Sequence, residues 1–152
     1  MKKKALPIVE TLLWIIMIWT MTLRCGGDDT PPTPTPQEEA YAILSGGWSI
    51  SQGGGITLDG HDVSLNYSRI TLSFSDGVYV TNNAGNLFSA RGVWNWADEA
   101  ARFINLDDGT VLNIVSLTAE EFVFSFQLNS TRGVVNGPSG ISGNYVIAVN
   151  KN

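Results

Sequence analysis

The chain has 152 residues, a single cysteine and a net charge of −5. Four of its nine basic residues and one of its fourteen acidic residues precede Cys25, so the part that begins at Cys25 carries a net charge of −8. An acidic chain without basic clusters argues against nucleic-acid binding, where cationic patches supply much of the affinity, and against electrostatic docking on anionic lipid. One cysteine also excludes a disulfide within the chain.

The first 24 residues have the layout of a secretory signal peptide. Lys2, Lys3 and Lys4 precede an apolar stretch from Leu12 to Met21 that is interrupted only by Thr20. A basic start followed by a short apolar segment is typical of such a leader, and a transmembrane helix needs roughly 20 apolar residues. We therefore predict a signal peptide over residues 1–24. An ordinary signal peptide cut elsewhere and an uncleaved N-terminal anchor are the alternatives.

Cys25 stands where such a leader would be cut, and we predict that it is the lipid-carrying first residue of a mature lipoprotein. Its surroundings depart from the usual pattern, because Arg24 puts a bulky cation where small residues are the rule. The start Cys-Gly-Gly-Asp-Asp resembles lipoproteins of Bacteroides-type bacteria, in which acidic residues after the cysteine accompany display on the cell surface. This resemblance implies a lipid anchor in the bacterial outer membrane, facing the cell surface or the periplasm.

A stiff linker is predicted between this cysteine and the folded part. Prolines and threonines fill the stretch from Thr30 to Pro36, and such a segment favours the extended polyproline II conformation, which has no core to bury. We place the linker at residues 25–40. The remainder, residues 41–152, has the length of one ordinary domain and can bury a core without disulfides.

The end of the linker carries the signals of a helix start. Thr35 can cap the helix, Pro36 suits its first position, and Glu38 stands at the capping-box spacing. Tyr41 and Leu44 give the helix an apolar side. Two glycines after Ser45 are expected to end it.

Beyond these glycines the apolar residues recur at every second position, which indicates strands with one buried face. Three Asp-Gly pairs between the apolar runs favour tight hairpin turns. Strands are predicted at Trp48–Ser51, Ile56–Leu58, Arg69–Ser75, Val78–Asn82, Leu87–Trp94, Arg102–Leu106, Thr110–Leu117, Glu121–Leu128 and Asn144–Asn150. Short connections favour antiparallel pairing of sequential strands, so we predict an all-β fold in which an up-and-down meander of 8–9 strands closes into a barrel. A β-sandwich is the alternative.

The motif Gly46-Gly47-Trp48, which follows the short helix and opens the meander, resembles the Gly-x-Trp start of lipocalin-type barrels. The segments Ala90–Trp94 and Phe103–Gly109 resemble the small lipocalin-like lipoproteins of Bacteroides-type bacteria. The resemblance implies that Trp48 is a structural plug at the closed end of the barrel. Full lipocalins are longer and place an arginine over this tryptophan, where the final strand here offers only Lys151.

The resemblance also implies that the barrel binds a small hydrophobic ligand. Eight strands make a barrel just wide enough to be filled by its own side chains or to hold one small ligand, so a packed interior is the alternative. The residues predicted to line a cavity are large inward-facing aromatics: Phe74, Phe88, Trp94, Phe124 and Phe126. Trp96 is expected past the strand end, at the surface or the rim. A packed interior with exposed aromatics would favour an interaction module that binds a protein or glycan through its exterior or loops.

Catalysis and metal binding have little support in the sequence. His61 is the only histidine and lies in a polar turn, and no serine has the context of a nucleophile elbow. Asp59, Asp62 and the pair Asp107-Asp108 lack the twelve-residue calcium-loop pattern and are explained by turns. We therefore expect no enzyme activity, no metal, no cofactor and no nucleic-acid partner, and a monomer held at the membrane by its lipid.

Overall fold

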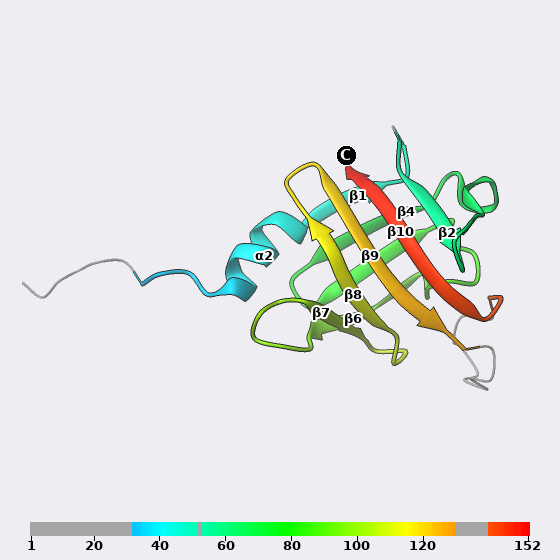
Figure 1. Cartoon of the computed structure of the whole chain (residues 1–152). Coiled ribbons are helices and arrows are strands. Elements are labelled where there is room, and N and C mark those ends of the chain that lie inside the picture. Colours follow the sequence, from blue (N-terminus) through cyan, green and yellow to red (C-terminus); the bar gives the residue numbers. More distant parts are fainter. Residues whose placement is uncertain (1–31, 52, 130–139) are drawn as a thin grey trace, which may run out of the picture. The chain divides into compact units, whose positions relative to one another are not determined.

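The computed structural model describes residues 32–51, 53–129 and 140–152. The compact unit runs from Pro34 to Asn152, and a single α-helix, a 3-10 helix and a strand-rich sheet make up its described residues (Figure 1). The predicted signal peptide and Cys25 lie outside the described residues. Within the described part, no helix has the length and hydropathy needed to cross a membrane.

The helix α2, Pro36–Leu44, begins as the sequence predicts. The Oγ1 of Thr35 accepts a hydrogen bond from the backbone N–H of Glu38 at 3.2 Å, and the Glu38 carboxylate accepts one from the backbone N–H of Thr35 at 2.7 Å. This capping box satisfies two backbone donors that would otherwise lack partners. The helix therefore starts before Tyr41, where the predicted domain begins, and its first residues belong to the compact unit.

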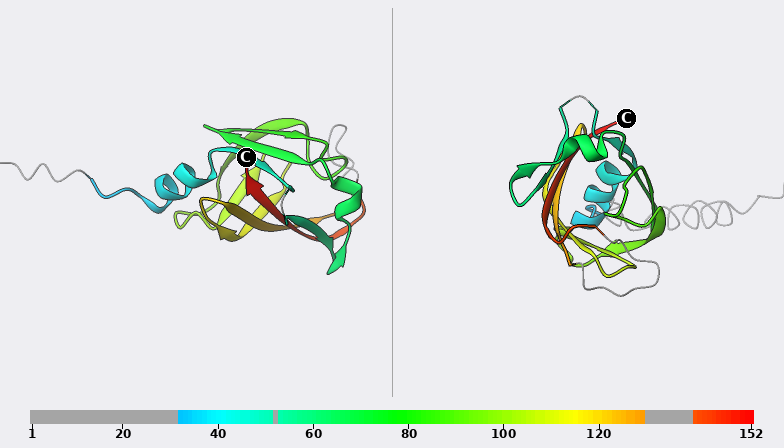
Figure 2. Two further views of the ribbon diagram at one scale, coloured as in Figure 1. Left: turned by 90° about the horizontal axis from the view of Figure 1, so that it is seen from above. Right: turned by 90° about the vertical axis from the view of Figure 1, so that its right-hand side faces the viewer.

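The strands form one antiparallel sheet that closes into a barrel of eight strands (Figures 1 and 2). From β4 to β10 each strand pairs with the next, and β1 pairs with both β4 and β10. Because β1 joins the two ends of the meander, the predicted all-β, lipocalin-like barrel is confirmed. The bounds are β1 Gly46–Ser49, β2 Gly55–Leu58, β3 His61–Asp62, β4 Thr71–Ser75, β5 Val78–Asn82, β6 Arg91–Trp96, β7 Phe103–Leu106, β8 Val111–Leu117, β9 Glu121–Leu128 and β10 Gly143–Lys151, with the 3-10 helix at Ser64–Tyr67.

One connection differs from the predicted meander, because β1 and β2 do not pair. The hairpin of β2 and β3 lies beside the first half of β10, whereas the end of β10 pairs with β1. Gly54 lies where the chain passes from β1 to β2. A Cβ added there would come within 2.5 Å of the Ala148 carbonyl oxygen and 2.9 Å of the Ile50 carbonyl oxygen. The glycine run therefore allows a close backbone approach that any other side chain would prevent.

The strand β6 also differs from its predicted position. It spans Arg91–Trp96 rather than Leu87–Trp94, because the buried Phe88 packs into the barrel from the loop before the strand. Trp96 is therefore the last residue of the strand and not a residue beyond it. Alternation along the strand puts Trp94 and Trp96 on the same face of the sheet.

Trp48 fills the end of the barrel where α2 lies. Its side chain is fully buried, and its Nε1 donates a hydrogen bond to the Leu44 carbonyl oxygen at 2.8 Å. The Nζ of Lys151 lies 4.2 Å from the centroid of the Trp48 ring and donates to two carbonyl oxygens at the end of the helix. Burial lowers the pKa of Lys151, while the carbonyl oxygens and the ring face stabilise its charge. Lys151 thus lies where the family resemblance would place an arginine.

Candidate functional site

The aromatics predicted to line a ligand cavity all lie in the hydrophobic core and are buried: Phe74, Phe88, Trp94, Phe124 and Phe126. Their rings contact one another. The Phe88 ring lies 4.9 Å from Phe126 and 6.2 Å from Phe124, and the Phe74 ring packs edge-on against Trp94 at 5.9 Å. Such ring contacts within the core favour the packed alternative over a ligand cavity at these residues.

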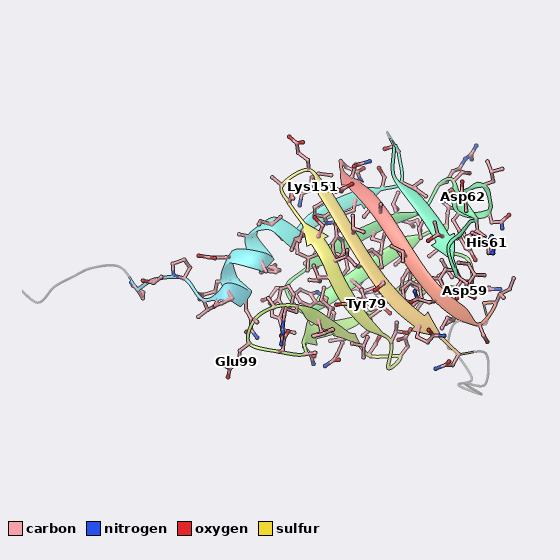
Figure 3. The ribbon with its side chains drawn as sticks, viewed as in Figure 1. Asp59, His61, Asp62, Tyr79, Glu99 and Lys151 are labelled. Carbon is pink, nitrogen blue, oxygen red and sulfur yellow. The ribbon has the colours of Figure 1, made fainter. Side chains whose placement is uncertain are left out.

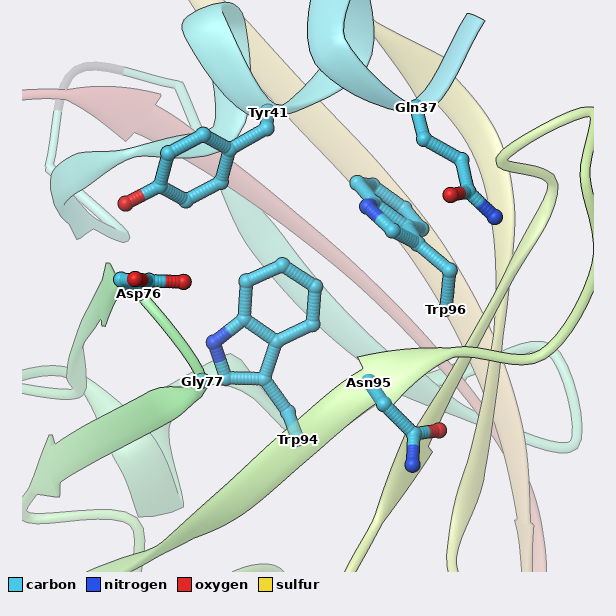
Figure 4. Close-up of a pocket in the computed structure, with 7 residues that line it drawn as sticks. All are labelled: Gln37, Tyr41, Asp76, Gly77, Trp94, Asn95 and Trp96. Atoms are coloured by element: carbon cyan, nitrogen blue, oxygen red, sulfur yellow. The ribbon is translucent and has the colours of Figure 1, made fainter.

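A pocket opens to solvent where α2 meets the barrel (Figure 4). Its volume is about 370 Å³, within the roughly 300–1,000 Å³ that is usual for small-molecule sites. Three elements supply its lining, namely the helix, the turn between β4 and β5, and the end of β6. The lining residues are Gln37, Tyr41, Asp76, Gly77, Trp94, Asn95 and Trp96. We call this the α2–β6 pocket.

Local structure explains why these residues meet. Gln37 and Tyr41 are four residues apart on α2, so they lie on one face of the helix. Gln37 also ties the helix to the loop after β6, since its Nε2 donates to the Asp98 carbonyl oxygen at 2.9 Å. The turn between β4 and β5 brings Asp76 to the same end of the barrel, because Gly77 adopts a positive φ of 65° that closes the turn tightly.

Three aromatic side chains form one wall of the pocket. The Trp94 ring lies 6.0 Å from Tyr41 at an interplanar angle of 30°, and 5.2 Å from Trp96 at 87°. Trp94 is the fixed member of the cluster: it is only 6% exposed, and its Nε1 donates to the Ser75 carbonyl oxygen at 2.9 Å. Tyr41 and Trp96 are half-buried and lie on either side of Trp94 (Figure 4).

Polar groups surround these rings, and several have no protein partner. Among the described residues, the Asp76 carboxylate forms no ion pair or hydrogen bond, and neither the Tyr41 hydroxyl nor the Trp96 indole N–H is hydrogen-bonded. The Asn95 side chain lies on the opposite face of β6 from Trp94 and Trp96 and accepts a hydrogen bond from Asn105 at 3.1 Å, so it does not face the rings (Figure 4). The pocket thus combines aromatic surface with hydrogen-bonding groups that are available to a ligand.

The other polar cluster considered in the sequence lies at the end of the barrel away from α2 (Figure 3). His61 and Asp62 are exposed on the short strand β3. Hydrogen bonds from Ser64 to Asp62 lower the pKa of this carboxyl group. Asp59 accepts a hydrogen bond from the backbone N–H of Asn144 at 2.9 Å. Over residues 32–51, 53–129 and 140–152, no group of three acidic, histidine or cysteine side chains could hold a metal ion.

Sequence reasoning found part of the pocket and missed the rest. Trp94 was predicted to line a ligand cavity and Trp96 was expected at the surface or rim, and the structure places both in the wall of this pocket. Gln37 and Asp76 were not selected, because one belongs to a helix and the other to a hairpin turn, and only the tertiary structure brings them together. Tyr41 was assigned to the apolar side of the helix. Its hydroxyl was the one feature in the sequence to indicate that this residue could also hydrogen-bond to a ligand.

No protein-family model matches this sequence, and no curated protein matches it. The resemblance to lipocalin-like lipoproteins therefore depends only on the sequence motifs, namely the Gly-x-Trp start of the barrel and the residues that follow Cys25.

Proposed function

We propose that this protein is a lipid-anchored binding module of the bacterial outer membrane, whose barrel is a packed scaffold and whose ligand binds in the α2–β6 pocket. The observation that carries the proposal is the contrast between the two candidate sites. The aromatics of the core contact one another, whereas the pocket at the helix has half-buried rings and polar groups without protein partners.

The anchor is proposed from the order of the segments in the sequence. A basic and apolar leader precedes Cys25, and a proline-rich linker separates this cysteine from the compact unit that begins at Pro34. Such a linker would hold the barrel away from the membrane, because polyproline II rises about 3.1 Å per residue. We place the protein among the small lipocalin-like lipoproteins of Bacteroides-type bacteria, as a monomer.

Cys25→Ala is expected to abolish membrane association of the protein in bacterial cells. A lipoprotein is held by its acyl chains, each buried CH₂ contributing about 0.8 kcal/mol, and the variant would carry none. The measurement is fractionation of cells combined with palmitate labelling. Thr33→Ala is the matched control, since it changes the linker but keeps the cysteine. A Cys25→Ala protein that still fractionates with the membranes and labels with palmitate would contradict the anchor.

Binding in the pocket can be tested on a leaderless form, Gly26–Asn152. The buried apolar side chains of the described structure all lie between Leu44 and Val149. This form contains all of them. It also retains three tryptophans, Trp48, Trp94 and Trp96, so its ¹H–¹⁵N spectrum holds three indole signals. One of them reports on the closed end of the barrel and two report on the pocket.

A chemically mixed library of fragments is expected to contain members that shift the Trp94 and Trp96 indole signals and leave the Trp48 signal in place. Trp96→Phe and Trp94→Phe each assign one signal by removing it, and the third signal then belongs to Trp48. If no fragment of any class shifts the two pocket signals, the pocket is not a binding site. Shifts of the Trp48 signal by apolar fragments would instead indicate an internal site, as a carrier would have.

A further inference from the structure

We infer that the α2–β6 pocket takes a carbohydrate, with a neutral pyranose ring against the Trp96 and Tyr41 rings and its hydroxyl groups on the polar side chains around them. This inference rests on the proposed function, since it names the ligand class of the same pocket. It follows from the kinds of surface that the pocket offers, from the spacing of its rings and from its charge.

The first step is the match between the pocket and a sugar ring. A pyranose has apolar C–H faces and a rim of hydroxyl groups that both donate and accept hydrogen bonds. The pocket presents partly exposed faces of Tyr41 and Trp96, which can pack on such a face. Acceptors and donors lie beside them: the Asp76 carboxylate, the Gln37 side-chain amide and the Tyr41 hydroxyl. Hydroxyl groups suit this mixture, because each can satisfy either kind of partner.

The second step compares a sugar with a compact cation held in a cage of rings. Such a cage needs aromatic faces set apart around the charge. Here the rings are packed together, with Trp94 at 6.0 Å from Tyr41 and 5.2 Å from Trp96. These distances leave no room for an ammonium group between Trp94 and either of its two neighbours. A flat ring, by contrast, can lie against the solvent-facing side of the cluster.

The third step concerns charge. Asp76 is the one ionisable carboxylate in the lining, and the protein from Cys25 onward has a net charge of −8. An anionic sugar would be repelled by this carboxylate, whereas the hydroxyl groups of a neutral sugar can donate to it in charge-assisted hydrogen bonds. Neutral sugars are therefore expected to bind more tightly than uronic acids of the same ring.

The pocket is also held in its binding shape before any ligand arrives. Trp94 is fixed by its hydrogen bond to Ser75, and Gln37 is fixed by its hydrogen bond to Asp98. A preformed surface avoids part of the entropy cost of ordering side chains on binding. The pocket is open to solvent, so we expect weak binding, with a dissociation constant on the order of 1 mM for a single sugar, and tighter binding of longer chains.

The test is a titration of the ¹⁵N-labelled leaderless form with three sets of compounds. The first contains neutral hexopyranosides and their oligosaccharides, the second contains uronic acids, and the third contains choline and lysine methyl ester. Saturable shifts of the Trp94 and Trp96 indole signals are expected with the first set and much smaller shifts with the second. The Trp48 signal should not move.

Two variants locate the binding. Trp96→Ala should weaken binding of the neutral sugar at least about tenfold, and Asp76→Asn should weaken it and reduce the preference over the uronic acid. Val93→Ala is the matched control, because Val93 is 56% exposed and lies on the outer face of the same strand; it should leave binding unchanged. An unshifted Trp48 signal in each variant shows that the fold is intact.

The outcomes separate the two proposals. Binding of amines alone, or of non-carbohydrate fragments alone, at the Trp94 and Trp96 signals would overturn the carbohydrate inference and leave the binding module standing. Sugar binding that survives Trp96→Ala undiminished would also overturn the inference, since the sugar would then lie elsewhere. Absence of shifts with every compound and every fragment would overturn both.

Discussion

Replacing Trp48 by alanine is expected to lower the free energy of unfolding by roughly 3–5 kcal/mol, the range for truncation of a buried aromatic side chain. The indole is fully buried and packs against the Phe122 ring at 5.7 Å. Its removal would also leave the Leu44 carbonyl oxygen without its donor and Lys151 without the ring face beneath its charge. The measurement is chemical unfolding of the leaderless form.

Trp96→Ala provides the matched comparison, because it removes the same side chain from a half-buried site at the rim. A much smaller loss of stability is expected there, since solvent already reaches part of the ring and the pocket can collapse around the gap. Equal, small losses for both variants would mean that Trp48 does not close the barrel. The assignment as a lipocalin-like barrel would then lose its central residue.

The barrel could be predicted from the sequence because its determinants are local. Alternating apolar residues mark each strand, and the capping box at Thr35 and Glu38 marks the helix start. Short connections leave most sequential strands little choice of partner, so the meander from β4 to β9 follows, whereas β9 and β10 pair across a longer connection. Closure into a barrel was expected because it removes both exposed edges of the sheet, and the structure shows that β1 provides it.

The predictions failed where the deciding contact is distant in sequence. The pairing of β2 with β10 depends on how closely Gly54 can approach Ala148. No sequence pattern near Gly54 indicates that contact. The boundary of β6 was misplaced because Phe88 is as apolar as a strand residue but packs into the core from a loop. The burial of Phe88 was expected correctly, but the element that carries it is a loop and not a strand.

The α2–β6 pocket was harder to predict than the fold for the same reason. Trp94 and Trp96 lie two residues apart, so their shared face follows from the strand. Tyr41 and Asp76 reach them from a helix and from a turn, and their meeting depends on the position of α2 at the end of the barrel. A carboxylate in an Asp-Gly turn gives no sign of a site, because the turn alone explains it.

Phe124→Ala is expected to lower the free energy of unfolding by roughly 3–5 kcal/mol, because its ring is fully buried and its loss would leave a cavity in a packed core. The ring lies 4.6 Å from Phe122, 6.2 Å from Phe88 and 6.3 Å from Phe126, so four aromatic side chains share this part of the interior. Val123→Ala is the matched control. Val123 precedes Phe124 on β9 and is only half-buried, and its truncation should cost far less.

The same variant distinguishes a packed barrel from a hollow one when a fluorescent hydrophobic probe is added. With a packed interior, the unmodified protein should bind no probe, since the contacting rings leave no space for it. With a hollow interior, the unmodified protein would bind the probe, and Phe124→Ala would weaken that binding while leaving most of the stability intact. The second pattern would restore the carrier of a small hydrophobic ligand as the function and would make the α2–β6 pocket secondary. The first pattern would leave the α2–β6 pocket, with the rings of Tyr41 and Trp96, as the proposed ligand site.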